Sequence, residues 1–222
     1  GGPDGGAAVD VWAIRLLRAG MILALAVLGV NNLYRVPAWF GFDVVGHMEY
    51  IHYIAQFGRL PLAPDGWKMN EAPLFHLVSS IPYRVIYTGF TAEQNTMAMR
   101  VIPILCGLLQ VEVVFRTIRL AFPAHRFALA GGTARRAVLA MAIYLSQFPS
   151  NQPFVGVLAA IGVYFAVRLA VLPQQRERWP EWLLMGLAIG LAVLSKITAL
   201  LVLPGALIAA GLSVIGDARL RD

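Results

Sequence analysis

The residues best suited to chemistry lie in a polar stretch between the first two long apolar runs of the chain. Asp43, His47 and Tyr50 recur at helical spacing, so a carboxylate and an imidazole lie one turn apart on one face. A carboxylate can take a proton from a hydroxyl group, and a neighbouring imidazole can orient it. A structural interpretation is also open, in which Asp43 caps a helix and the other two side chains lie at a wet interface. Both interpretations predict a helix over 43–57 that ends at Gly58.

A second carboxylate, Glu71, lies just before a proline that opens the next apolar stretch. Its negative charge could stabilise the start of that helix. It could instead bind a metal ion or act as an acid facing Asp43. His47 could join Glu71 at a metal, but two ligands make a poor site, so we favour His47 as the residue that orients Asp43. A divalent cation therefore stays open as a cofactor, and His76 is expected at the interface.

Three cations could bind an anionic substrate group: Lys196, Arg59 and Arg84. Lys196 interrupts the apolar run 182–215, where a charge is costly unless it has a function. The alternative for Lys196 is a side chain that snorkels to the interface, and the alternative for the two arginines is contact with lipid headgroups. Tyr50 could stack on a sugar or simply anchor the interface.

The composition predicts a membrane protein. Of 222 residues, 59% are hydrophobic and 14% are charged, where soluble domains carry about 25% charged residues. These values exclude a disordered chain, a coiled coil and an ordinary soluble enzyme. The single cysteine, Cys106, excludes a disulfide framework and a multi-cysteine metal site. The net charge of +6 could suggest nucleic acid, but the basic residues lie between apolar runs, so we exclude that partner.

The apolar runs predict an all-α, polytopic membrane helix bundle. A span needs roughly 20 apolar residues. We expect a flexible leader at 1–10 and a membrane domain at 11–222. We predict about six spans, at 11–31, 101–120, 135–149, 153–172, 182–195 and 198–215.

Charge bias orients these spans. The segment 73–89 could lie at the membrane interface or span the membrane. If it lies at the interface, most of the Lys and Arg residues fall on one side of the membrane, and the positive-inside rule identifies that side as cytoplasmic. We therefore expect a cytoplasmic N-terminus and an extracytoplasmic loop, 31–100, that carries juxtamembrane helices at about 43–57 and 73–89. The turn 146–153, with Asn151, and the turn at Lys196 would meet this loop on the outer face.

The order of motifs in this loop resembles a known family. Asp-x-x-Gly-His-x-x-Tyr-Ile starts at Asp43, Gly-Arg-Leu-Pro occupies 58–61, and Glu-x-Pro-Leu starts at Glu71. Together they resemble the first extracytoplasmic loop of GT-C type glycosyltransferases, in the branch of the dolichyl-phosphate-mannose–protein mannosyltransferases and the aminoarabinose transferases of lipid A. Further collinear similarities lie at 100–122, 146–151 and 190–198.

The resemblance implies a GT-C-like fold and a function. The chain would be the N-terminal portion of a longer multi-pass enzyme of the bacterial inner or plasma membrane, inactive by itself. That enzyme would transfer a hexosyl or pentosyl group from a polyprenyl-phosphate donor to a hydroxyl of a protein, lipid or glycan acceptor on the outer face. Asp43 matches the family's catalytic base, Glu71 matches a metal-binding Glu of the aminoarabinose branch, and Lys196 matches a Lys near the lipid-phosphate cavity.

Two departures from the family pattern bear on the metal and on a second carboxylate. Val44 stands where many relatives have an acidic residue, and Pro73 is a single proline where they have two. The alternative function is a non-catalytic membrane module that binds lipid or resembles a transporter.

Overall fold

The computed structural model describes residues 4–123, 125–138, 140–172 and 178–219. Within these ranges the chain is helical and contains no strand. The elements are α1 (Asp4–Arg35), α2 (Val44–Phe57), the 3-10 helix η1 (Ala63–Asp65), α3 (Leu74–Ile86), α4 (Ala92–Met99), α5 (Val101–Ala121), α6 (Arg126–Val138), α7 (Ala140–Leu145), α8 (Asn151–Val171), α9 (Trp179–Ser195), the 3-10 helix η2 (Ile197–Val202) and α10 (Leu203–Arg219).

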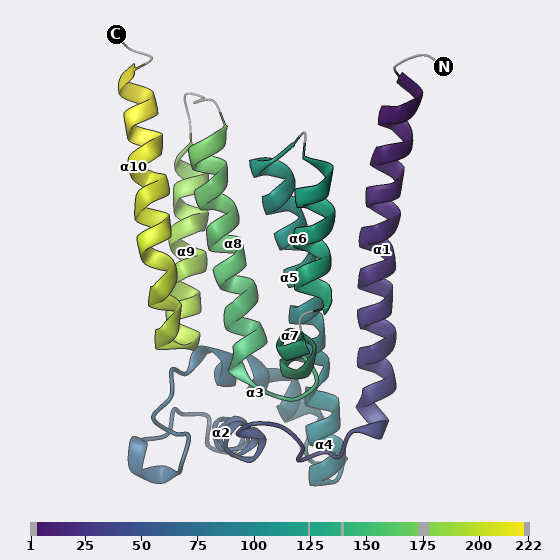
Figure 1. The fold of residues 1–222 in the computed structure, drawn as a ribbon. Coiled ribbons are helices and arrows are strands. Elements are labelled where there is room, and N and C mark those ends of the chain that lie inside the picture. The colour runs from purple at the N-terminus through teal and green to yellow at the C-terminus, as the bar shows by residue number, and fades with distance from the viewer. Residues whose placement is uncertain (1–3, 124, 139, 173–177, 220–222) are drawn as a thin grey trace.

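The long helices run side by side, and the short ones gather at one end. Figure 1 shows α2, α3 and α4 at the end opposite the two chain termini, with α2 lying across the bundle. By length and composition, three helices of the described part could cross a membrane: Trp12–Arg35, Ala92–Ala121 and Asn151–Val171. The all-α membrane bundle is therefore confirmed, and the chain is an integral membrane protein. The number of crossings stays a prediction.

One expected span has different bounds in the structure. The segment predicted at 135–149 is divided between α6, which already begins at Arg126, and α7. The pair Gly131-Gly132 favours a loop by propensity. In the fold, however, a Cβ atom on Gly132 would lie 2.5 Å from Cδ1 of Ile118, so the glycine lets α6 approach α5 closely. Tertiary packing overrides propensity here.

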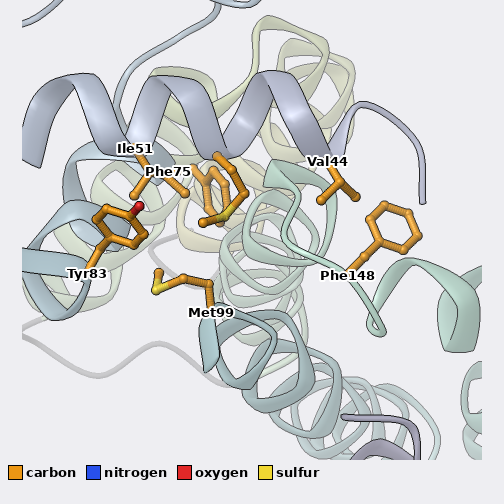
Figure 2. Packing of buried hydrophobic residues seen from close by; sticks show 7 residues of the cluster. Val44, Ile51, Phe75, Tyr83, Met99 and Phe148 are labelled. Carbon is orange, nitrogen blue, oxygen red and sulfur yellow. The ribbon is translucent and has the colours of Figure 1, made fainter. Parts of the chain in front are cut away.

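The helix α2 is held against the bundle by one apolar face. Val44, Met48 and Ile51 are buried, and they pack with Phe75 of α3 and Phe148 of the turn before α8 (Figure 2). Each fully buried side chain of this size contributes about 1.5–3 kcal/mol. Helices do lie where they were expected at 43–57 and 73–89, as α2 and α3, although α3 ends at Ile86; their place at the membrane interface stays a prediction. Gly58 ends α2 as expected, with a left-handed φ of 66° and its N–H donating to the carbonyl of Ile54 at 2.9 Å.

A buried arginine anchors the start of the loop that follows α1. Arg100 is 1% exposed and donates to main-chain carbonyls where α1 ends. Its acceptors are Asn32, Leu33, Val36, Pro37 and Ala38. The last carbonyls of a helix and those of the turn that follows lack a full set of backbone partners, although Asn32 and Pro37 also accept from the N–H groups of Val36 and Phe40. The guanidinium satisfies the remaining capacity and fixes the path of the loop.

Antiparallel packing of α8 and α9 brings the turn before α8 and the turn at Lys196 to the same end of the bundle (Figure 1). Gly162 of α8 allows this approach, because a Cβ atom there would lie 2.7 Å from Cγ1 of Ile189 in α9. Asn151, the first residue of α8, and Lys196, which ends α9, therefore lie at the same end of the bundle.

Candidate functional site

A lysine that the sequence reasoning did not single out joins the two candidate carboxylates. Nζ of Lys68 lies 2.7 Å from Oδ2 of Asp43 and 2.7 Å from Oε1 of Glu71. Burial opposes the charge on Lys68, but its hydrogen bonds to Asp43 and Glu71 outweigh burial and raise the pKa of this ammonium group. Lys68 is therefore positively charged and holds Asp43 and Glu71 on either side of it.

The network continues from the loop into the bundle. Oε2 of Glu71 accepts a hydrogen bond of 2.9 Å from the side-chain amide of Asn151, which is 1% exposed. The amide oxygen of Asn151 accepts in turn from Nζ of Lys196 at 3.5 Å. The loop that carries Glu71, the start of α8 and the end of α9 thus meet through three side chains. These pieces come together as the sequence predicted, and the face of the membrane on which they meet stays a prediction.

Asp43 lies at the N-cap position of α2 without capping it. Its side chain accepts no capping hydrogen bond, and its backbone is left-handed, with φ at 60°. That conformation costs a non-glycine residue roughly 1–2 kcal/mol. The capping interpretation is therefore wrong, because the side chain turns to Lys68 instead. Gly46 makes this approach possible, since a Cβ atom there would lie 2.4 Å from Cγ of Lys68.

Two buried histidines lie beside Glu71. Nδ1 of His47 is 3.0 Å from Nε2 of His76 and 3.9 Å from Oε2 of Glu71. Tyr50 stacks on the ring of His76 with centroids 4.0 Å apart, and its hydroxyl donates to the carbonyl oxygen of Glu71 at 3.4 Å. Burial, followed by the charge of Glu71, raises the pKa of Tyr50. His76 is fully buried within the protein, and its expected place at the membrane interface stays a prediction.

Both imidazoles are neutral near pH 7. Burial is the largest cause that lowers the pKa of His47 to about 4, and Lys68 adds to it. Burial, followed by the neighbouring His47, lowers the pKa of His76 to about 3. The contacts of His47 are to His76 and Glu71, whereas the carboxylate of Asp43 is paired with Lys68. The expectation that His47 orients Asp43 therefore has no support in these contacts.

His47, Glu71 and His76 have the donor chemistry to bind a divalent metal ion. His47, Glu71 and His76 each offer one ligand atom, and these atoms lie within 4.8 Å of one another. Neutral imidazole nitrogens and a carboxylate are suitable ligands for zinc and similar ions. Sequence reasoning found two of the three. It missed His76 because that residue lies on α3, whose packing against α2 no local spacing reveals.

Two expected substrate-binding arginines lie outside this network. Arg84 donates from Nη2 to the carbonyl of Ile54 at 2.9 Å, and so holds the end of α2 against α3. Arg59 is exposed, with its guanidinium 6.0 Å from the ring centre of Tyr53. Of the other expected site residues, Tyr50, Asn151 and Lys196 do lie in or beside the network.

Comparison with known protein families gives a match over most of the chain. Residues 71–221 match the family model described as dolichyl-phosphate-mannose-protein mannosyltransferase. This range begins at Glu71 and includes Asn151 and Lys196, whereas Asp43 and Lys68 precede it. No curated protein and no solved structure matches the chain.

Proposed function

The chain belongs to the dolichyl-phosphate-mannose–protein mannosyltransferase family, and from this premise we propose that it carries the base and the phosphate-binding cations of sugar transfer from a polyprenyl phosphate to an acceptor hydroxyl. Membership makes the chain part of a membrane glycosyltransferase that uses a polyprenyl-phosphate sugar donor. The roles of individual residues, the acceptor and the face of the membrane are our proposal.

The observation that carries the proposal is the continuous network from Asp43 through Lys68, Glu71 and Asn151 to Lys196. It sets two carboxylates, Asp43 and Glu71, and two ammonium groups at the same end of an apolar bundle. A displacement at a sugar carbon needs both kinds of group, because a proton must leave the acceptor while negative charge develops on the departing phosphate.

Asp43 is suited to take the proton of the acceptor. Its Oδ2 is held by Lys68, and among the described residues its Oδ1 has no hydrogen-bond partner. The free oxygen can accept from an acceptor hydroxyl while Lys68 fixes the carboxylate. As the acceptor oxygen bonds to the sugar carbon, the bond from that carbon to the phosphate oxygen breaks, and the proton moves to Asp43.

Lys196 and Lys68 are suited to stabilise the departing phosphate. Nζ of Lys196 has one long contact, 3.5 Å to Asn151, so most of its hydrogen-bonding capacity is free among the described residues. A lysine in an apolar bundle is costly unless an anion compensates its charge. The phosphate of the donor supplies such an anion, and its prenyl chain can remain in the bilayer.

The positive-inside rule assigns a side to the network. Segments at the opposite end, among them the start of α1, the end of α5 and the start of α6, carry many of the basic residues of the described part (Figure 1). We therefore propose that the network faces away from the cytoplasm.

The proposal includes a divalent cation, because two imidazoles and a carboxylate lie close enough together to bind one. Bound by His47, Glu71 and His76, such an ion would add positive charge beside the phosphate. The chain's own residues would then position it, with Tyr50 packed against His76.

Removal of the Lys196 charge tests this function. In the intact protein, Lys196→Gln is expected to lower kcat/KM for a radiolabelled polyprenyl-phosphate sugar by about 10–100-fold, which is the effect of one charged hydrogen bond. Arg35→Gln is the matched control, because Arg35 is exposed at the same end and lies outside the network. Equal turnover in the Lys196 variant and the control would refute the role of Lys196. Polyprenyl phosphate that binds normally without any sugar transfer by the wild type would favour the non-catalytic module.

A further inference from the structure

A polar hollow lies between the helices, away from the network that runs from Asp43 to Lys196. A cavity of about 380 Å³ opens between α1, α5 and α8. Its lining residues are Arg18, Glu112, Phe115, Arg116, Arg119, Leu120 and Tyr164. Glu112 and Tyr164 come more than ten residues after the starts of α5 and α8, so the hollow lies roughly 16–20 Å along the bundle from the outer end. The proposed sugar transfer does not use it.

The hollow has more positive than negative charge. Glu112 accepts from Arg18 at 3.4 Å and from Arg116 at 2.7 Å. Arg119 lies one turn beyond, and within the part of the chain that the structure describes it has no ion-pair partner. The hollow therefore has three guanidinium groups and one carboxylate, and that carboxylate pairs with two of them.

These charges lie in two segments that are apolar enough to cross a membrane. Arg18 lies within the apolar segment Trp12–Arg35, and the other three lie within Ala92–Ala121. Ionisable groups in such segments are normally paired with one another or with a ligand. Basic pockets between membrane helices on the cytoplasmic side bind the phosphates of lipid headgroups.

The remaining lining suits an amphiphilic ligand. Phe115 is 3% exposed and forms one wall, with the guanidinium of Arg18 4.8 Å from its ring centre. Leu120 adds an apolar surface next to Arg119, and the Tyr164 hydroxyl accepts from Arg168 at 3.4 Å. A guanidinium group can donate two parallel hydrogen bonds to two oxygens of one phosphate. Apolar side chains beside it can contact the glycerol and the first methylene groups of a phospholipid.

We propose that this hollow binds a phosphate group, and that the phosphate belongs to an anionic phospholipid of the inner leaflet. The ligand chemistry is that of a phosphodiester bound by Arg119, Arg116 and Arg18. The lipid would join α1 to α5 at the end of the bundle opposite the network. A free phosphate ion shares this chemistry, and the test separates the two sources.

The test measures thermal unfolding of the purified chain in detergent with three additions: phosphatidylglycerol, phosphatidylcholine or inorganic phosphate. We expect phosphatidylglycerol to raise the unfolding midpoint in a saturable manner, and phosphatidylcholine not to do so. Arg119→Gln should raise the half-saturating phosphatidylglycerol concentration about tenfold or more, the loss expected for a charged hydrogen bond. Because Arg119 has no ion-pair partner among the described residues, its removal leaves the pairs of Glu112 in place.

The matched control is Arg15→Gln. Arg15 is exposed on α1, one turn from Arg18, and does not line the hollow. This control should bind phosphatidylglycerol within about twofold of the wild type. The proposal is overturned if the two phospholipids stabilise equally or if Arg119→Gln binds as the wild type does. Saturable stabilisation by inorganic phosphate and not by phosphatidylglycerol would overturn the lipid assignment.

Discussion

Replacing Asp43 with asparagine separates the chemistry of this residue from its structural role. Asparagine has the same shape and tolerates the left-handed conformation at φ 60° that an alanine would strain. The variant loses the charge that faces Lys68, but Lys68 keeps its bond of 2.7 Å to Glu71. Since 38% of the Asp43 side chain is exposed, solvent screening limits the cost to about 0–1 kcal/mol of folding free energy.

The expected effect on catalysis is far larger than the effect on stability. A missing general base lowers turnover by about 10²–10⁴-fold. The assay is transfer of radiolabelled sugar from a polyprenyl phosphate by the intact protein in membranes, with thermal unfolding measured in parallel. Glu49→Gln is the matched control, because Glu49 is an exposed carboxylate on the same helix. Wild-type turnover in Asp43→Asn would refute the assignment of the base, and so would an equal loss in the control.

Three further predictions concern the residues that hold the site. Lys68→Gln should lower the unfolding free energy by about 1–3 kcal/mol, because both of its carboxylate partners lose a charged donor; an unchanged chemical-denaturation midpoint would contradict this. Arg100→Gln should lower the unfolding free energy by about 1–3 kcal/mol, because buried carbonyl groups that accept from Arg100 lose this donor; a variant as stable as the wild type would disprove the anchor. In the metal-free chain, the unfolding free energy should be highest above pH 6.5 and should decrease as the pH falls towards 4. In the unfolded chain His47 is protonated at its ordinary pKa of 6.5, whereas in the folded chain burial lowers its pKa to about 4. The loss attributable to His47 is about 3 kcal/mol, and an unfolding free energy that is flat between pH 7 and 4.5 would contradict it.

Local patterns in the sequence predicted α2 and the break at Lys196. The spacing of apolar residues and the positions of Asp43 and Gly58 placed α2 to within one residue, because an amphipathic helix and its end signals are short-range properties. The division of the long apolar run at Lys196 was also predicted, since a lone charge marks a break between two apolar segments.

The partners of the site residues could not be predicted in the same way. Lys68 lies 2.7 Å from Asp43, yet the two are far apart along the chain, in a loop without regular periodicity. One available signal was the i,i+3 spacing of Lys68 and Glu71, which allows an ion pair. Another was Gly46, a glycine inside a helix that marks a close approach by another segment.

His76 shows why a residue type does not reveal its surroundings. A histidine in an apolar stretch with two prolines is compatible with an interface and with a core. Packing of α3 beneath α2 decided the matter, since it stacked His76 on Tyr50 and removed it from solvent. That packing is a long-range property of the fold.

The most direct test of the proposed mechanism is a structure of the intact protein with a polyprenyl-phosphate sugar bound. We expect the donor phosphate within about 3 Å of Nζ of Lys196, the reach of a hydrogen bond. The free oxygen of Asp43 should face the sugar carbon from the side opposite the phosphate, with room for an acceptor hydroxyl between them. A donor phosphate bound away from both Lys196 and Lys68, or a sugar that Asp43 cannot face, would contradict the account.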